Sequence, residues 1–462
     1  MMRLPLPAPA VRYSALPLTV PLAQLPRSVR LFPVWFFVTY LTGTVLLFAF
    51  GPWPWPVENS FSLYTFLVLA HCALVAGYMV GIQDIPRGYS GRSARSVLRW
   101  SVWLALVWAI PGFILRTNGA VLNPIAAAEL VWSGLTQPGV VYDLHQIQAA
   151  TVPAPRVLDL ASWFFHPIVW LCVPLGVYYW NRLATLWRVA VIVCALADVA
   201  GWIAVGTNKG IADLAIVVTS LLVAGHSKAI ARMKPRRIVG AIFLGTVLFA
   251  FFLAFYGAGQ AGRGRGETTS HDGYAKIFAD EDHPLVRFLP PDVKRAALAG
   301  LSYLTQGYYG LSLAMQEPFV TTYGVGNSYF TMGISRKLFG TDAVFERTYA
   351  ARIRQSKWDA FRRWHSFYTW IASDVSFPGT IAIVFCVGWL LAKLWLDVIR
   401  GDNVYAVGLF PLVLIMLFYF PANNQTLAFS HTALPFWWLL FMWRLTRGSA
   451  RSSSRVPVRV SR

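Results

Sequence analysis

Charged residues are scarce in this chain, and acidic residues are the scarcest. Only 13% of the 462 residues are charged, with 20 acidic against 40 basic side chains. An average soluble domain carries about 25% charged residues. Together with a mean hydropathy of +0.52, this low share excludes a water-soluble enzyme of this size.

Cysteine is also rare. The four cysteines lie in apolar runs, with neither CxxC spacing nor a cluster near histidine: Cys72, Cys172, Cys194 and Cys386. A disulfide framework or a zinc site needs regularly spaced cysteines. We therefore predict no disulfide framework and no zinc site. No other part of the sequence leads us to predict a metal or a cofactor.

Long apolar runs dominate the rest of the chain. A helix needs about 20 mostly apolar residues to cross a bilayer, and ten runs approach this length. We therefore predict an all-α polytopic membrane protein with about 10 transmembrane helices. The runs are residues 32–50, 61–82, 97–115, 163–180, 189–205, 211–224, 238–256, 377–396, 404–420 and 427–443.

The distribution of basic residues predicts the orientation. With the N-terminus in the cytoplasm, the cytoplasmic segments hold 23 basic and three acidic residues, and 17 of each remain elsewhere. Basic residues accumulate in cytoplasmic loops, so we expect both termini in the cytoplasm. The net charge of +20 then follows from topology, and nucleic acid is not needed as a partner.

Five regions follow from this topology: a cytoplasmic arm (1–30), seven helices (31–256), a large outer loop (257–376), three helices (377–443) and a basic tail (444–462). The loop is too long to be a mere connector, so we expect function there. Within it, we predict an interfacial helix over residues 296–315. Residues 345–363 predict a basic amphipathic helix lying on the membrane.

Three cations are candidates for binding phosphate. Arg263 and Arg265 lie in the glycine-rich stretch 257–266. Glycines let a ligand approach the backbone, and the arginine fork matches phosphate oxygens. Lys209 lies in the tight turn GTNKG between two apolar runs. The alternatives are a solvated loop for the arginines and a lysine that reaches to the membrane interface.

Four other polar residues have two interpretations each. Asp198 and Asp213, in the runs flanking Lys209, either pair with a cation or hydrogen-bond between helices. Asn423 and Asn424, between the last two runs, either bind sugar hydroxyls or are ordinary turn residues.

The densest polar segment is residues 364–379, WHSFYTWIASDVSFPG. If it is helical, His365, Tyr368 and Thr369 share one face, and Asp374, nine positions after His365, lies about half a circle around the helix from them. His365 and Asp374 then form a pair only if the helix breaks between them. A histidine bracketed by aromatic and basic residues suits a general base. Alternatively, His365 bonds to backbone, and Asp374 caps the next helix.

Three segments carry a family resemblance: GTNKG, YLTQGYYGLSLAM with residues 323–328, and HSFYTWIASDVSFPG. Residues 209–424 resemble bacterial oligosaccharide repeat-unit polymerases of the Wzy type. These are related to O-antigen ligases in a GT-C-like glycosyltransferase superfamily. The family's basic turn residue, commonly Arg, falls on Lys209. The family also has a motif directly before a membrane span: Asn or His, then Tyr and Thr, then Asp and Gly. In this sequence these positions are His365, Tyr368, Thr369, Asp374 and Gly379.

The resemblance implies a metal-independent glycosyltransferase of the bacterial inner membrane that makes O-antigen, capsule or exopolysaccharide. It would transfer the growing glycan from undecaprenyl pyrophosphate to an acceptor sugar hydroxyl on the periplasmic face. The implied partners are the lipid-linked oligosaccharide, membrane lipids, a chain-length regulator and a flippase.

This chemistry assigns a role to each candidate residue. The site must neutralise pyrophosphate, orient the acceptor and remove one proton. The catalytic candidates are His365, as base, and Asp374. The candidates for binding substrate are Lys209, Arg263, Arg265, Tyr368, Thr369, Asn423 and Asn424.

Three alternatives differ in what they require. An O-antigen ligase differs from a polymerase in its acceptor. A flippase or transporter for a lipid-linked glycan is expected to show internal repeats, and the two halves of this sequence show none. A metal-dependent transferase needs acidic residues in the first outer loop, which holds only Glu58.

Overall fold

A computed structural model describes residues 25–83, 93–119, 123–152, 155–230, 270–271, 277–354, 358, 363, 365–400 and 403–447. These residues are mostly helical, and the two short strands pair antiparallel. The elements are α1 (Arg27–Phe50), α2 (Ser60–Gly81), α3 (Ala94–Arg116), α4 (Pro124–Thr136), α5 (Pro138–Thr151), α6 (Arg156–Val169), α7 (Cys172–Tyr178), η2 (Trp180–Arg182), α8 (Thr185–Ile203), α9 (Lys209–Ile230), β1 (Ser270–His271), β2 (Ile277–Phe278), α11 (Pro291–Ala314), α12 (Tyr329–Phe339), α13 (Ala343–Arg347), α14 (Tyr349–Arg352), α15 (Phe367–Arg400), α16 (Val404–Tyr419), α17 (Gln425–Ala428) and α18 (Ser430–Thr446).

Seven helical stretches in the described part of the chain are long and apolar enough to cross a membrane: α1, α2, α3, the stretch Arg156–Tyr178, α8, α9 and α15. Large apolar side chains on their surfaces face outward, as in Trp35, Trp100 and Ile110, which are 59%, 61% and 73% exposed. Such surfaces suit contact with lipid. The prediction of a polytopic membrane protein is thereby confirmed at the level of helix length and composition.

The predicted spans differ from the helices in detail. The predicted run 238–256 lies outside the described residues, and the other nine fall on helices. The run that was expected to begin at residue 377 begins at Phe367 instead, because residues 367–375 already form a helical stretch. Ser376 then breaks the helix with φ 64°, and the second part continues from there to Arg400.

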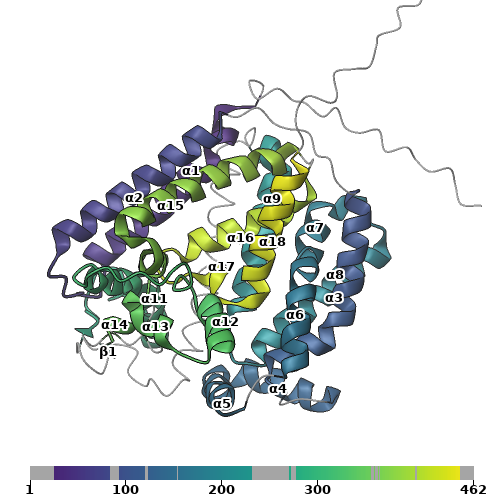
Figure 1. Cartoon of the computed structure of the whole chain (residues 1–462), viewed down its shortest axis with the longest axis horizontal. Coiled ribbons are helices and arrows are strands. Elements are labelled where there is room, and N and C mark those ends of the chain that lie inside the picture. The colour runs from purple at the N-terminus through teal and green to yellow at the C-terminus, as the bar shows by residue number, and fades with distance from the viewer. Residues whose placement is uncertain are drawn as a thin grey trace, which may run out of the picture.

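The helices form two groups around a central one (Figure 1). α16 is buried from Val404 to Leu417, between a group of α1, α2 and α15 and a group of α3, α6, α7 and α8. The first group packs tightly because glycines bring α2 and α15 together. A Cβ at Gly77 would lie only 1.9 Å from the carbonyl oxygen of Phe385.

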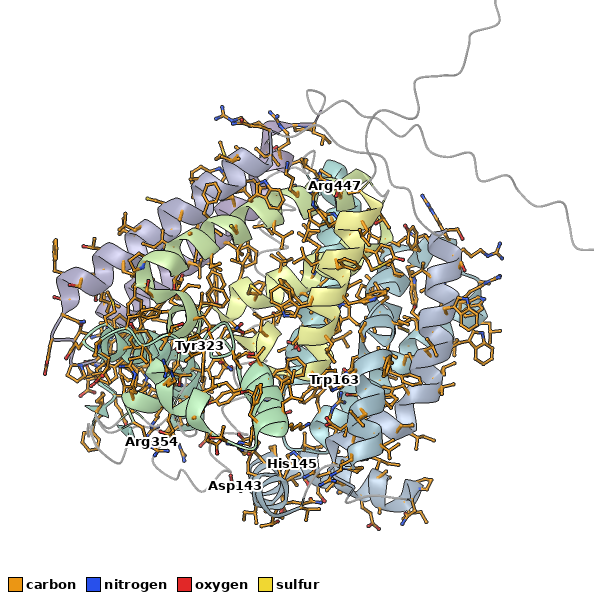
Figure 2. The ribbon with its side chains drawn as sticks, in the orientation of Figure 1. Asp143, His145, Trp163, Tyr323, Arg354 and Arg447 are labelled. Carbon is orange, nitrogen blue, oxygen red and sulfur yellow. The ribbon has the colours of Figure 1, made fainter. Side chains whose placement is uncertain are left out.

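Helices α4, α5, α11, α12, α13 and α14 lie toward one end of the bundle, which we call the loop end (Figure 1). Tyr323, Trp163 and His145 lie toward this end, whereas Arg447 lies at the opposite, tail end (Figure 2). The helix predicted over residues 296–315 is part of α11. It bridges the first group and the loop-end segments, because it packs against α1, α2 and α15.

The amphipathic helix predicted over residues 345–363 is wrong. Two short helices, α13 and α14, occupy its first part, and the described residues that follow are not helical. Phe345, Tyr349 and Ile353 are at most 7% exposed. Their apolar side chains pack into the protein, so they are not available to lie on a membrane surface.

Candidate functional site

Two glycines of the YLTQGYYG segment bring the motif-bearing segments into contact. On α11, a Cβ at Gly307 would lie 2.1 Å from the carbonyl oxygen of Pro421 and 2.9 Å from the amide nitrogen of Ser366. A Cβ at Gly310 would lie 3.1 Å from Nδ1 of His365. This glycine face therefore presses α11 against the start of α15 and the turn after α16.

His365 lies at this contact and is 1% exposed. Its ring centroid is 6.0 Å from that of Trp370, and neither ring nitrogen has a hydrogen-bond partner among the described residues. Burial lowers the pKa of His365 to about 3, because a buried imidazolium loses its hydration. The imidazole is therefore neutral at pH 7, and an acceptor hydroxyl reaches it only after the covering groups move.

Asp374 does not face His365; it anchors the loop that precedes α12. Its Oδ1 accepts hydrogen bonds from Thr322 Oγ1 and from the amide nitrogen of Gly326, the latter at 3.0 Å. Its Oδ2 accepts from Asn327 Nδ2 at 2.9 Å. The helix begins at Phe367, after His365, so the shared helical face expected for His365, Tyr368 and Thr369 does not form.

Hydrogen bonds extend this anchor to the turn after α16. Asn424 Nδ2 donates to the carbonyl oxygen of Asn327 at 2.7 Å, and Asn423 Oδ1 accepts from the amide nitrogen of Asn424 at 2.8 Å. We call residues 322–328, His365, Asp374, Asn423 and Asn424 the loop junction. Asn423 and Asn424 thus act as turn residues here, and their role toward sugar stays a prediction.

Tyr368 and Thr369 point into packed surroundings. Tyr368 is 1% exposed, and its ring lies 5.6 Å from that of Phe66. Thr369 is fully buried, and its hydroxyl hydrogen-bonds with that of Ser366 at 3.2 Å. In this conformation both side chains position the start of α15, and their predicted contact with substrate stays a prediction.

A second polar group surrounds Trp202, and we call it the Trp202 cluster: Arg116, His166, Asp198, Trp202, Lys209, Asp213 and His431. Lys209 is the first residue of α9. Its Nζ lies 2.5 Å from Asp213 Oδ2, in a pair whose side chains are 7% and 9% exposed. The same Nζ is 5.6 Å from the ring of Trp202. Lys209 is therefore already neutralised.

Arg116 approaches Trp202 from the end of α3. Its guanidinium carbon is 4.3 Å from the Trp202 ring centroid, and its Nη2 is 2.8 Å from Asp198 Oδ1. Two glycines make room for these side chains. A Cβ at Gly201 would lie 2.5 Å from Arg116 Nη1, and one at Gly210 would lie 2.3 Å from Trp202 Cδ1.

Two histidines complete the Trp202 cluster. The ring of His431 is 4.8 Å from that of Trp202 and 6.3 Å from that of His166. Among the described residues, His166 Nδ1, Asp213 Oδ1 and His431 Nε2 are buried polar atoms with no hydrogen-bond partner. Buried polar atoms are normally satisfied, so the cluster has capacity for a polar ligand.

The candidate site residues predicted from the sequence did not include Arg116, His166 or His431. One sequence pattern could have identified these residues. Several apolar runs each carry an ionisable residue inside the run or at its end, and such residues commonly mark functional sites. The short helix α17 connects the Trp202 cluster with the loop junction. Asn424, in the loop junction, directly precedes α17, and Phe429 directly follows α17. The ring of Phe429 lies 5.3 Å from Lys209 Nζ.

Arg263 and Arg265 lie outside the described residues. Within the described part of the chain, no group of three His, Cys, Asp or Glu side chains is arranged to hold a metal ion. No protein-family model, curated protein or solved structure matches the chain.

Proposed function

We propose that the chain is a metal-independent glycosyltransferase that polymerises lipid-linked oligosaccharide repeat units. The growing glycan moves from undecaprenyl pyrophosphate to a sugar hydroxyl of the next unit, and undecaprenyl pyrophosphate leaves. The site faces the periplasmic side of the bacterial inner membrane. The observation that carries the proposal is the Trp202 cluster, which holds two cations at the loop end of apolar helices.

The chemistry fits this placement. A lipid-linked diphosphate lies at the membrane surface, so a cation that binds it needs to sit at the end of a spanning helix, as Arg116 does. Cations held in a site of low dielectric stabilise charge that develops on the leaving group. The neighbouring loop junction offers amides to the sugar through Asn423 and Asn424, and the acceptor proton goes to His365.

The test is a product ladder. Purified protein is incubated with lipid-linked repeat units, and the glycans are separated on a gel. We expect a ladder from the unmodified chain and none from His365→Ala or Arg263→Ala, while single units remain translocated in cells. His226→Ala, an exposed residue near the other end of α9, is the matched control and retains the ladder. A single shift that requires lipid A core identifies a ligase instead.

The Trp202 cluster also favours a second candidate, a transporter for an anionic lipid-linked glycan. Ionisable residues within spanning helices commonly line a substrate path, and Asp198, Asp213 and His166 lie within such helices. In that case, variants of the cluster abolish the appearance of single units across the membrane, and no ladder forms without a membrane gradient.

A further inference from the structure

The two ion pairs of the Trp202 cluster differ in how readily they separate. Lys209 and Asp213 are buried on both sides, at 7% and 9% exposure of the side chains. Removing one partner of such a pair leaves an uncompensated charge away from water. By contrast, the second ion pair, Arg116 with Asp198, is only partly buried: the side chain of Asp198 is 55% exposed and that of Arg116 is 17% exposed. Asp198 is therefore held less firmly by packing than Asp213, and its carboxylate can turn away from Arg116 without disrupting buried contacts.

From this difference we infer that Arg116, and not Lys209, is the cation that binds the diphosphate of the lipid-linked substrate. The inference rests on the proposed function and names the residue that carries its anion site. Asp198 occupies Arg116 in the absence of ligand and is displaced by a phosphate group. Lys209 and Asp213 form a fixed pair that supports Trp202.

The position of Arg116 suits an exchange of anions. Its guanidinium group lies over Trp202 at 4.3 Å, and stacking of this kind uses the face of the group. The edge, with its fork of N–H donors, is the part that binds anions. Displacement of the Asp198 carboxylate frees Nη2 for a phosphate oxygen, while Nη1 keeps its bond to the backbone carbonyl. In this structure the edge donates to Asp198 twice, through Nη1 to the backbone carbonyl at 2.9 Å and through Nη2 to Oδ1 at 2.8 Å.

The surroundings supply a second, independent observation. Asp213, which is 6% exposed, has an unpartnered Oδ1, and His166 Nδ1 and His431 Nε2 are also buried without partners among the described residues. The three atoms come from α9, α6 and α18, which converge on Trp202. Such atoms require polar contacts that this conformation does not provide. A phosphate oxygen accepts from a ring N–H of either histidine, whereas Asp213 Oδ1 is itself an acceptor and needs a donor such as water.

The test measures binding of undecaprenyl diphosphate in detergent micelles to the purified full-length chain. Arg116→Gln is expected to weaken binding by about 10- to 100-fold, the range for losing a charge-assisted hydrogen bond. Arg116→Lys keeps the charge but loses the fork, and it should bind between the two. Asp198→Asn should tighten binding by up to about 5-fold, because a half-exposed pair competes only weakly.

The matched variant replaces the buried pair by apolar residues, Lys209→Met with Asp213→Leu. Such replacements commonly preserve the fold, and melting temperature checks this for every variant. We expect the double variant to retain diphosphate binding. The inference is overturned if a folded double variant loses binding, or if folded Arg116→Gln binds as the unmodified chain does.

Competition experiments identify which phosphate compound binds at Arg116. Comparison with the product ladder distinguishes failure of this inference from failure of the proposed function. Vesicles of phosphatidylglycerol should not compete with undecaprenyl diphosphate; equal competition would overturn the assignment to substrate. Inorganic pyrophosphate should compete, because it carries the recognised group. Arg116-dependent binding without any product ladder leaves this site standing and refutes the polymerase. A normal ladder from Arg116→Gln refutes the site and leaves the polymerase standing.

Discussion

The carboxylate of Asp374 should hold the loop at residues 322–328 in place, and Asp374→Ala tests this directly. The substitution removes the acceptor for Gly326, Asn327 and the hydroxyl of Thr322. The global fold should survive, because the carbonyl oxygen of Ser373 lies 2.8 Å from Thr322 Oγ1 and accepts its single hydrogen once the carboxylate is gone. The expected effect is therefore local opening of the loop.

The magnitude follows from the bond to the amide of Gly326, which is 3.0 Å long and donates to a charged acceptor. Hydrogen bonds to charged groups contribute about 1.5–3 kcal/mol, and each 1.4 kcal/mol is tenfold in an equilibrium. The amide of Gly326 should thus exchange about 10- to 100-fold faster. Asp374→Asn should lie between, since its amide retains one oxygen but opposes the Nδ2 donor of Asn327.

Hydrogen-exchange mass spectrometry on peptides spanning residues 322–328 measures this change. The control is Asp292→Ala, which removes a carboxylate whose side chain is 93% exposed and paired with Arg295 on α11. It should leave exchange in the loop unchanged. If Asp374→Ala and Asp292→Ala give the same exchange in these peptides, Asp374 does not anchor the loop, and a direct catalytic role regains support.

Two further predictions concern packing and pH. Gly210→Val should lower the melting temperature, because its Cβ would meet Trp202 Cδ1 at 2.3 Å and overpacking costs about 1–3 kcal/mol. Gly225→Ala, in the same helix with nothing within 4 Å, should leave the melting temperature equal or higher; equal losses would contradict this reasoning. Folding stability should fall by about 1.6 kcal/mol between pH 6.5 and 5 because of His365. Over this range the unfolded imidazole gains a proton, whereas the buried one, with pKa about 3, does not. Denaturant titrations at both pH values should show a smaller loss for His365→Asn, and an identical loss would refute the assignment.

The sequence predicted the membrane class well because apolar run length is a local property. A bilayer imposes about 20 apolar residues on each spanning helix, and nine of the ten predicted runs fall on helices in the described ranges. The pairing of Lys209 with Asp213 is also local, since residues four apart share a helix face. Spacing alone did not decide whether Asp213 pairs or bonds between helices.

The candidate site was harder to predict because its contacts join distant segments. Asp374 was paired with His365 in the sequence interpretation only on condition of a helix break. In the structure its partners lie 47 to 52 positions away, in the loop before α12. The basic pattern of residues 345–363 indicated a surface helix, but burial of Phe345 and Tyr349 in the protein prevailed over that periodicity.

The sequence by itself determined that this chain carries helices long and apolar enough to cross a membrane, and which polar residues interrupt its apolar runs. Only the tertiary structure decided which cation meets a distant anion: Arg116, at the end of α3, pairs with an exposed carboxylate 82 positions away on α8. The physical reason is that helix formation depends on neighbours in the chain. Burial and pairing of a charge depend on which helices pack together.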